Sequence, residues 1–150
     1  MNIIKLRGVG VLMKISTKGR YGLTIMIDLG KHYGEGPLPL RKIAAQNELS
    51  EAYLEQLVGP LRNSGLVKSV RGAYGGYMLT RHPKEISAGD VIRVLEGPIQ
   101  PVEGIEDEKQ PQRELWVRIR DAVKNVLDTT TIEDLANAEN DETENYMYYI

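Results

Sequence analysis

Apolar residues along the chain recur mainly at the spacing of a helix rather than that of a strand. The first such stretch predicts a helix over residues 17–33, which Ser16 or Thr17 can cap. Leu23 and Ile27 lie roughly opposite the main apolar stripe of this helix. A helix that is apolar on two faces is covered on both, so we expect one face to meet its own domain and the other a partner chain.

Two short helices are predicted next, over residues 40–46 and 51–64, with a tight turn at residues 47–49 between them. Ser50 is placed to cap the second helix. The apolar positions of that helix, spaced i, i+3, i+4 and i+7, are Leu54, Leu57, Val58 and Leu61. Two short helices joined by a three-residue turn are the DNA-binding helix–turn–helix, whose second helix enters the major groove.

A β-hairpin and further helices are predicted in the second half of the chain. Residues 66–70 and 77–79 have the composition of two short strands around a glycine-rich, basic tip. Helices are expected over residues 88–96 and 113–127, and a last short helix begins near Thr131. The fold class is therefore mainly α with a small β-hairpin wing: a winged helix–turn–helix plus a long C-terminal dimerisation helix.

These elements divide the chain into five parts. They are a start-site extension before a second Met (1–12), a winged helix–turn–helix DNA-binding domain (13–98), an acidic loop (99–112), the dimerisation helix with a short final helix (113–138) and an acidic tail that ends in Tyr-Ile (139–150). The alternative for residues 1–12 is a short disordered or edge-pairing arm. No stretch has the length and the small-residue cleavage site of a signal peptide.

The long helix carries a broader apolar face than one small domain needs to cover. Its members are Leu115, Trp116, Ile119, Ala122, Val123 and Val126. Two such helices packed together would bury this face, and a two-fold dimer would match a palindromic DNA site. We therefore expect a homodimer whose interface also includes Leu23 and Ile27.

Composition excludes several kinds of chemistry. The 150 residues include no Cys, so disulfides, thiolate metal sites and thiol nucleophiles are excluded. His32 and His82 are too far apart in sequence for a local metal motif. The glycines between Gly72 and Gly76 lack the following helix and lysine of a phosphate-binding loop, and no nucleophile elbow is present. We expect a protein that is not an enzyme.

The net charge of −2 conceals an asymmetry between the two halves of the chain. Residues 1–80 carry 11 basic and 5 acidic residues, whereas residues 81–150 carry 8 and 16. A basic front half that coincides with a helix–turn–helix favours a DNA-binding module. The main alternative is an enzyme-regulating interaction protein that works through its acidic C-terminal tail.

Candidate DNA contacts follow from side-chain chemistry. Gln56 can pair bidentately with adenine, and Glu55 can accept a hydrogen bond from cytosine. Arg71 at the hairpin tip can reach a minor groove. The remaining candidates for phosphate or groove contacts are Lys14, Lys18, Arg20, Arg41, Lys42, Ser50, Tyr53, Arg62, Lys68 and Tyr74. Each charge taken alone is equally consistent with a solvated surface, and only their placement on one module favours DNA.

Four motifs, at residues 16–21, 53–57, 65–72 and 75–77, closely resemble the Rrf-two family of bacterial winged-helix transcription regulators. The resemblance runs from Met13 to about Ala138. It implies a homodimeric repressor that is joined by its long helix and binds a near-palindromic operator. Within the family, the segments 95–99 and 113–123 and the C-terminal Tyr-Ile are most similar to the repressors of cysteine metabolism in Gram-positive bacteria.

The resemblance also bears on cofactors and partners. Many family members bind an iron–sulfur cluster through three Cys before the dimerisation helix, but the corresponding residues 101–108 contain none, so we expect no cofactor. The similarity to the cysteine repressors implies a cytoplasmic protein whose signalling partner is cysteine synthase (O-acetylserine thiol-lyase). Tyr148, Tyr149 and Ile150 are the candidate partner-binding residues; alternatively, this chain end folds back on the dimer.

Overall fold

The computed structural model describes residues 15–138 of the chain. The elements are α2 (Thr17–Lys31), α3 (Leu40–Asn47), α4 (Glu51–Asn63), β1 (Val67–Val70), β2 (Gly76–Leu79), η1 (Pro83–Glu85), α5 (Ala88–Glu96), η2 (Ile105–Asp107) and α6 (Gln112–Thr129), followed by helical residues 132–138. This order confirms the predicted fold class, and the helix and strand bounds agree with the prediction to within two residues.

Short-range polar contacts explain where several helices begin. The Ser50 side chain accepts a hydrogen bond from the backbone N–H of Tyr53 and so caps α4. Ser87 and Asp90 form a reciprocal capping box at the start of α5. Thr131 and Asp134 make the same pair of hydrogen bonds before the last helix, at 3.0 and 2.9 Å. All three caps fall at the helix starts that the sequence predicted.

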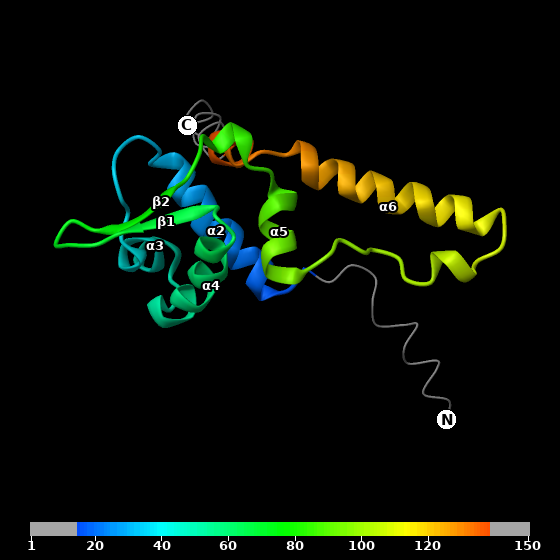
Figure 1. The fold of residues 1–150 in the computed structure, drawn as a ribbon, viewed down its shortest axis with the longest axis horizontal. Coiled ribbons are helices and arrows are strands. Elements are labelled where there is room, and N and C mark those ends of the chain that lie inside the picture. The colour runs from blue at the N-terminus through cyan, green and yellow to red at the C-terminus, as the bar shows by residue number, and fades with distance from the viewer. Residues whose placement is uncertain (1–14, 139–150) are drawn as a thin grey trace, which may run out of the picture.

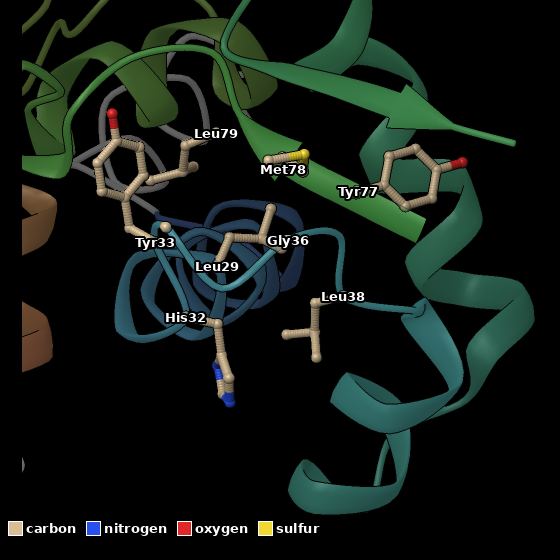
Figure 2. A pocket seen from close by; sticks show the side chains of 9 residues that line it. Leu29, His32, Tyr33, Gly36, Leu38, Tyr77, Met78 and Leu79 are labelled. Carbon is tan, nitrogen blue, oxygen red and sulfur yellow. The ribbon is translucent and has the colours of Figure 1, made fainter. Parts of the chain in front are cut away.

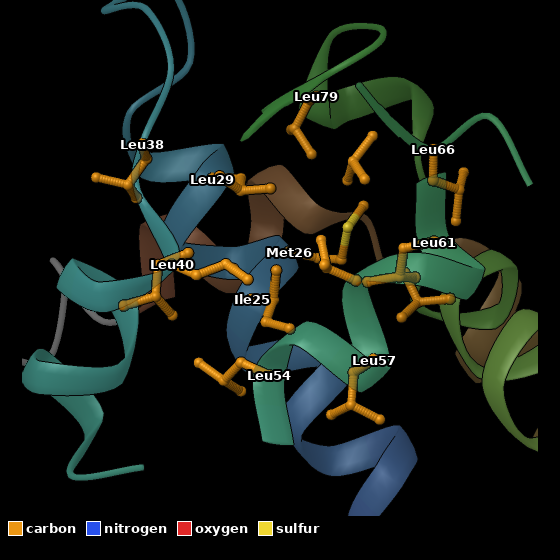
Figure 3. Packing of buried hydrophobic residues seen from close by; sticks show 14 of the residues in the cluster. Ile25, Met26, Leu29, Leu38, Leu40, Leu54, Leu57, Leu61, Leu66 and Leu79 are labelled. Carbon is orange, nitrogen blue, oxygen red and sulfur yellow. The ribbon is translucent and has the colours of Figure 1, made fainter. Parts of the chain in front are cut away.

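The core forms around α2, which contacts α4, α5 and β2 (Figure 1). Ile25 and Met26 of α2 are fully buried and meet the inner face of α4, where Leu54 and Leu61 are also fully buried (Figure 3). The predicted inner stripe of α4 is therefore confirmed. Burial of one such side chain stabilises the fold by about 1.5–3 kcal/mol, and these contacts hold the helix–turn–helix on α2.

The hairpin is attached to the helices by one additional backbone pair. β1 and β2 are antiparallel, with Val67 opposite Leu79. Tyr77 of β2 also pairs with Leu38, which precedes α3, through two N–H to C=O hydrogen bonds of 2.9 Å. Gly76 passes so close to this segment that a Cβ there would lie 2.4 Å from the carbonyl carbon of Leu38. The hairpin is thus held against the entry to the helix–turn–helix.

Helix α6 projects from the opposite end of the molecule to α3, α4 and the hairpin tip (Figure 1). The chain leaves α5, runs outward through residues 97–111 and returns along α6 towards the body (Figure 1). None of the residues of α6 is buried. Within residues 15–138, no helix combines the length and hydropathy that would let it cross a bilayer.

Candidate nucleic-acid interface

The turn between α3 and α4 has the geometry that a helix–turn–helix requires. Glu48 adopts the left-handed conformation (φ 55°) and its N–H donates to the Ala44 carbonyl, which ends α3 abruptly. Ser50 then starts α4 after three residues. Leu54 and Leu57 face the core, so the opposite face of α4 is left in solvent. The structure thus provides a recognition helix whose apolar face is packed on the core and whose opposite face is exposed to solvent.

The two candidate base-reading residues both lie on the open face. Glu55 and Gln56 are exposed, and so is Arg62 near the end of α4. Tyr53 differs from the expectation that it stands free beside them. It is half-buried, and its ring packs edge-on against Tyr21 of α2, with ring centroids 5.7 Å apart and planes at 86°. Tyr53 therefore braces α4 against α2, and a role in contacting DNA stays a prediction.

A second brace holds α3, and the sequence analysis missed it. Asp28 of α2 is 7% exposed. The side-chain amide of Asn47 donates hydrogen bonds of 2.8 Å both to the Asp28 carboxylate and to the Ile43 carbonyl. Asp28 and Asn47 are 19 positions apart in the sequence, and no periodic pattern links them. The contact fixes the last turn of α3 to α2 just before the chain enters the turn.

The exposed basic side chains of the first half of the chain share one property, the absence of a carboxylate ion pair. The exposed cations are Lys18, Arg20, Arg41, Lys42, Arg62, Lys68 and Arg71. Within residues 15–138 none of these seven makes an ion pair with a carboxylate. In contrast, Arg93 of α5 pairs with Asp128 at 2.6 Å, and Arg81 pairs with Asp90 at 3.8 Å. The exposed cations around the helix–turn–helix are therefore available to phosphates, whereas Arg81 and Arg93 are each engaged with an acid.

The hairpin tip adds an exposed extension to this surface. Arg71 is exposed, and Tyr74 is 94% exposed, the most of any large apolar side chain between residues 15 and 138. A hydrogen bond of 3.0 Å from the Gly75 N–H to the Gly72 carbonyl closes the tip. Ser50 is exposed as well, although its hydroxyl already accepts a hydrogen bond as the cap of α4. Lys14 lies outside the described residues.

The cavity between α2 and β2 is too small to bind a ligand. Leu29, Met78 and Leu79 line it, whereas the ring of His32 points away from them (Figure 2). Its volume is about 10 Å³, which is about enough for one water molecule. His32 instead contacts the Asp28 carbonyl oxygen through its Nδ1 atom. This part of the fold therefore supports the hairpin.

The motifs that surround this surface also match a known family. A model of the Rrf2 (Rrf-two) family, described as an iron-dependent transcriptional regulator, matches residues 15–138. The chain belongs to the Rrf2 family. The predicted resemblance is confirmed, and the protein is a transcriptional regulator rather than an enzyme.

Individual Rrf2 proteins are similar over most of the chain. The HTH-type transcriptional regulator CymR of Bacillus subtilis is 70% identical over 138 residues, which cover 92% of this chain and 100% of that protein. The structure of CymR (YrzC), described as the global cysteine regulator of B. subtilis, is 71% identical with a TM-score of 0.81 and covers 84% of this chain and 98% of that one. The oxidised form of Staphylococcus aureus CymR is 61% identical with a TM-score of 0.71, over 83% and 96%.

The iron dependence in the Rrf2 family description does not fit the residues of this chain. The groove between the outgoing segment and α6 is lined by Glu103, Glu106, Arg120 and Lys124, among others. Iron–sulfur clusters are held mainly by Cys thiolates, and the whole sequence contains none. No group of three or more potential metal ligands forms within residues 15–138. The described residues therefore supply no thiolate for an iron–sulfur cluster.

The residues predicted to form a dimer interface lie in two places. On α6, Leu115 is 48% exposed, Ile119 37% and Val126 61%; Ala122 is exposed, and Trp116 and Val123 are half-buried. Leu23 and Ile27 on α2 are half-buried, and Leu23 packs against the core of its own domain. Within residues 15–138, no element of the chain covers the apolar face of α6. Tyr148, Tyr149 and Ile150 lie outside the described residues.

Proposed function

We propose that the protein is a cytoplasmic, dimeric repressor of cysteine-metabolism genes that binds a near-palindromic operator through α3, α4 and the hairpin. The observation that carries the proposal is the set of seven exposed cations around an exposed face of α4 that form no ion pair with a carboxylate of residues 15–138. The similarity to CymR, described in B. subtilis as the global cysteine regulator, supports the choice of target genes.

The uncovered face of α6 supports the dimer. Large apolar side chains such as Leu115 and Val126 stand about half in water in a single chain. Two copies of α6 packed together would remove them from water, which is favourable by about 25 cal/mol per Å² of apolar surface. Because α6 lies at the opposite end from the recognition helix, the two recognition helices of such a dimer are free to read two half-sites (Figure 1).

DNA binding measured by fluorescence anisotropy tests the proposal. The probes are duplexes from upstream of cysteine-metabolism genes and shuffled duplexes of the same composition, each at several salt concentrations. The wild type is expected to prefer some of the upstream duplexes by at least about 10³-fold. Equal affinity for upstream and shuffled duplexes would contradict a gene-specific repressor.

Two kinds of variant separate the roles of the side chains. Gln56→Ala is expected to lose about 1–3 kcal/mol of operator binding and little of the binding to shuffled DNA, because a base contact carries sequence information. Lys42→Ala is expected to weaken binding to both duplexes alike, because a phosphate contact carries no sequence information. It should also lower the salt slope by about 1. If both variants behave alike, the assignment of roles is wrong.

We further propose cysteine synthase as the signalling partner, on the resemblance to cysteine repressors. A chain end with a free carboxylate and an Ile side chain suits a pocket that binds an amino-acid carboxylate. Deletion of Ile150 is expected to abolish the complex in calorimetry and to leave DNA binding by the dimer unchanged. O-acetylserine is expected to displace the wild-type protein from the enzyme. Equal affinity of the full-length and shortened proteins would refute this partner site.

A further inference from the structure

The carboxylate of Glu96 joins the two halves of the fold at one point. Its Oε1 atom accepts hydrogen bonds from the backbone N–H of Ser16 at 3.1 Å and of Gly19 at 2.9 Å. The Ser16 hydroxyl donates a third hydrogen bond to the same oxygen. Ser16 is also the N-cap of α2, where its hydroxyl accepts from the N–H of Lys18. The first turn of α2 is thus tied to the last residue of α5, 80 positions away.

The Glu96 carboxylate interacts favourably with the dipole of α2 and unfavourably with the dipole of its own helix, α5. A carboxylate at a helix C-terminus is opposed by the helix dipole, and Glu96 is the last residue of α5. The same carboxylate lies at the N-terminus of α2, where the dipole and the free N–H groups favour an anion. The chain also has glycine where the carboxylate approaches, since a Cβ at Gly19 would lie 3.0 Å from the Glu96 oxygen.

The electrostatics of Glu96 agree with this geometry. Burial alone raises the pKa of the Glu96 carboxyl. The hydrogen bonds from Ser16 and Gly19, together with the charge of Lys18, outweigh that effect and hold the pKa below its ordinary value. Glu96 is therefore ionised at neutral pH and occupies the anion position at the start of α2.

We infer that Glu96 is a positioning residue for DNA binding: it fixes the first turn of α2, which presents Lys18 and Arg20, to the point from which the chain leaves for α6. The inference rests on the proposed function, because it needs those two cations to meet phosphates. Both are exposed, and neither forms an ion pair with a carboxylate within residues 15–138, although the charge of Lys18 is felt by Glu96 at longer range. Since Glu96 already fills the end of α2, phosphates are met by these side chains and not by the helix N-terminus.

The inference predicts that removal of Glu96 weakens DNA binding, which is the opposite of what net charge alone predicts. Removal of an acidic residue makes the protein more positive, which by itself strengthens binding to DNA. Loss of a positioning contact has the opposite effect, because the two cations are no longer held at fixed places. Glu85 provides a matched control: it is an exposed carboxylate, and its removal changes the net charge by the same amount.

The experiment compares Glu96→Ala and Glu85→Ala with the wild type on operator DNA over a range of salt concentrations. Glu85→Ala is expected to bind as well as the wild type or slightly better. Glu96→Ala is expected to bind about tenfold more weakly. Its salt slope should fall by about 1–2, because up to two phosphate contacts are lost. Glu96→Gln keeps an acceptor oxygen and should recover part of the affinity. Glu96→Ala that binds like Glu85→Ala with an unchanged slope overturns the inference.

Replacement variants test the inference if Glu96→Ala does not fold, and hydrogen exchange tests it if the proposed function is wrong. If Glu96→Ala fails to fold by circular dichroism, Glu96→Gln and Ser16→Ala replace it, and wild-type affinity and salt slope in both overturn the inference. If the wild type shows no operator preference, the proposed function falls by itself. Hydrogen exchange at the Gly19 amide still reports on Glu96 in that case: protection that survives the loss of Glu96 overturns the inference, and selective loss of protection there supports the tie between α2 and α5.

Discussion

The attachment of the hairpin to the helix–turn–helix predicts a large effect of a very small substitution, Gly76→Ala. A Cβ at this position would lie 2.4 Å from the carbonyl carbon of Leu38, 2.5 Å from its oxygen and 2.7 Å from the nitrogen of Pro39. All three are backbone atoms, so no side-chain rotation relieves the contact. The segment before α3 and the hairpin must move apart, and the added methyl group has no other place to go.

The magnitude follows from the contacts that this movement breaks. The two hydrogen bonds between Leu38 and Tyr77, each 2.9 Å long, are worth about 1–3 kcal/mol together. Leu38 is 6% exposed and would lose part of its burial, which contributes about 1 kcal/mol more. We expect the free energy of unfolding to fall by about 2–4 kcal/mol and the thermal midpoint by roughly 10 °C.

Thermal unfolding followed by circular dichroism measures this effect, and Gly59→Ala is the matched control. A Cβ at Gly59 meets nothing within 4 Å. Alanine has a higher helix propensity than glycine, but a side chain on the residue before Pro60 disfavours the helical conformation. Because these two effects oppose each other, the net change in stability is expected to be small. Operator binding by Gly76→Ala below its midpoint should also weaken, because the hairpin carries Arg71. A midpoint for Gly76→Ala within 2 °C of that of Gly59→Ala, about what half a kcal/mol produces, would refute the reasoning.

Three further predictions concern assembly, pH and redox state. Ile119→Asp places a charge in the proposed contact between two copies of α6 and should give monomers or insoluble protein in sedimentation at micromolar concentration. Asn125→Asp, an exposed position on the same helix, should stay dimeric. A monomeric wild type would contradict the proposed contact. Because the folded-state pKa of Glu96 lies below its ordinary 4.5, the wild type should be more stable than Glu96→Gln above that pH and lose the advantage as the pH falls through the folded-state value; equal urea midpoints at pH 7 would count against this. Protein prepared without oxygen should be colourless, and diamide should leave operator affinity unchanged, since the chain has no Cys; visible cluster absorbance would disprove it.

The helices, their caps and the hairpin could be predicted from the sequence because each depends on residues close together in the chain. The inner stripe of α4 was predicted from spacing alone, and Leu54 and Leu61 are fully buried. The capping pairs of Ser87 with Asp90 and of Thr131 with Asp134 join residues only three positions apart, so they too depend on local sequence. The exposed Glu55 and Gln56 followed from the same periodicity, since residues off the apolar stripe of a helix face solvent.

The tertiary structure decided which polar groups meet across the fold. The sequence predicted Tyr53 only as a DNA contact, whereas its place beside Tyr21 depends on how α4 crosses α2. The pairs Asp28 with Asn47 and Ser16 with Glu96 join residues 19 and 80 positions apart, and local propensity says nothing of such distances. Hydrogen bonds act over about 3 Å and depend on direction, so they exist only once packing has set the helix axes. Apolar periodicity is a property of each helix by itself, whereas these contacts belong to the way the helices are arranged.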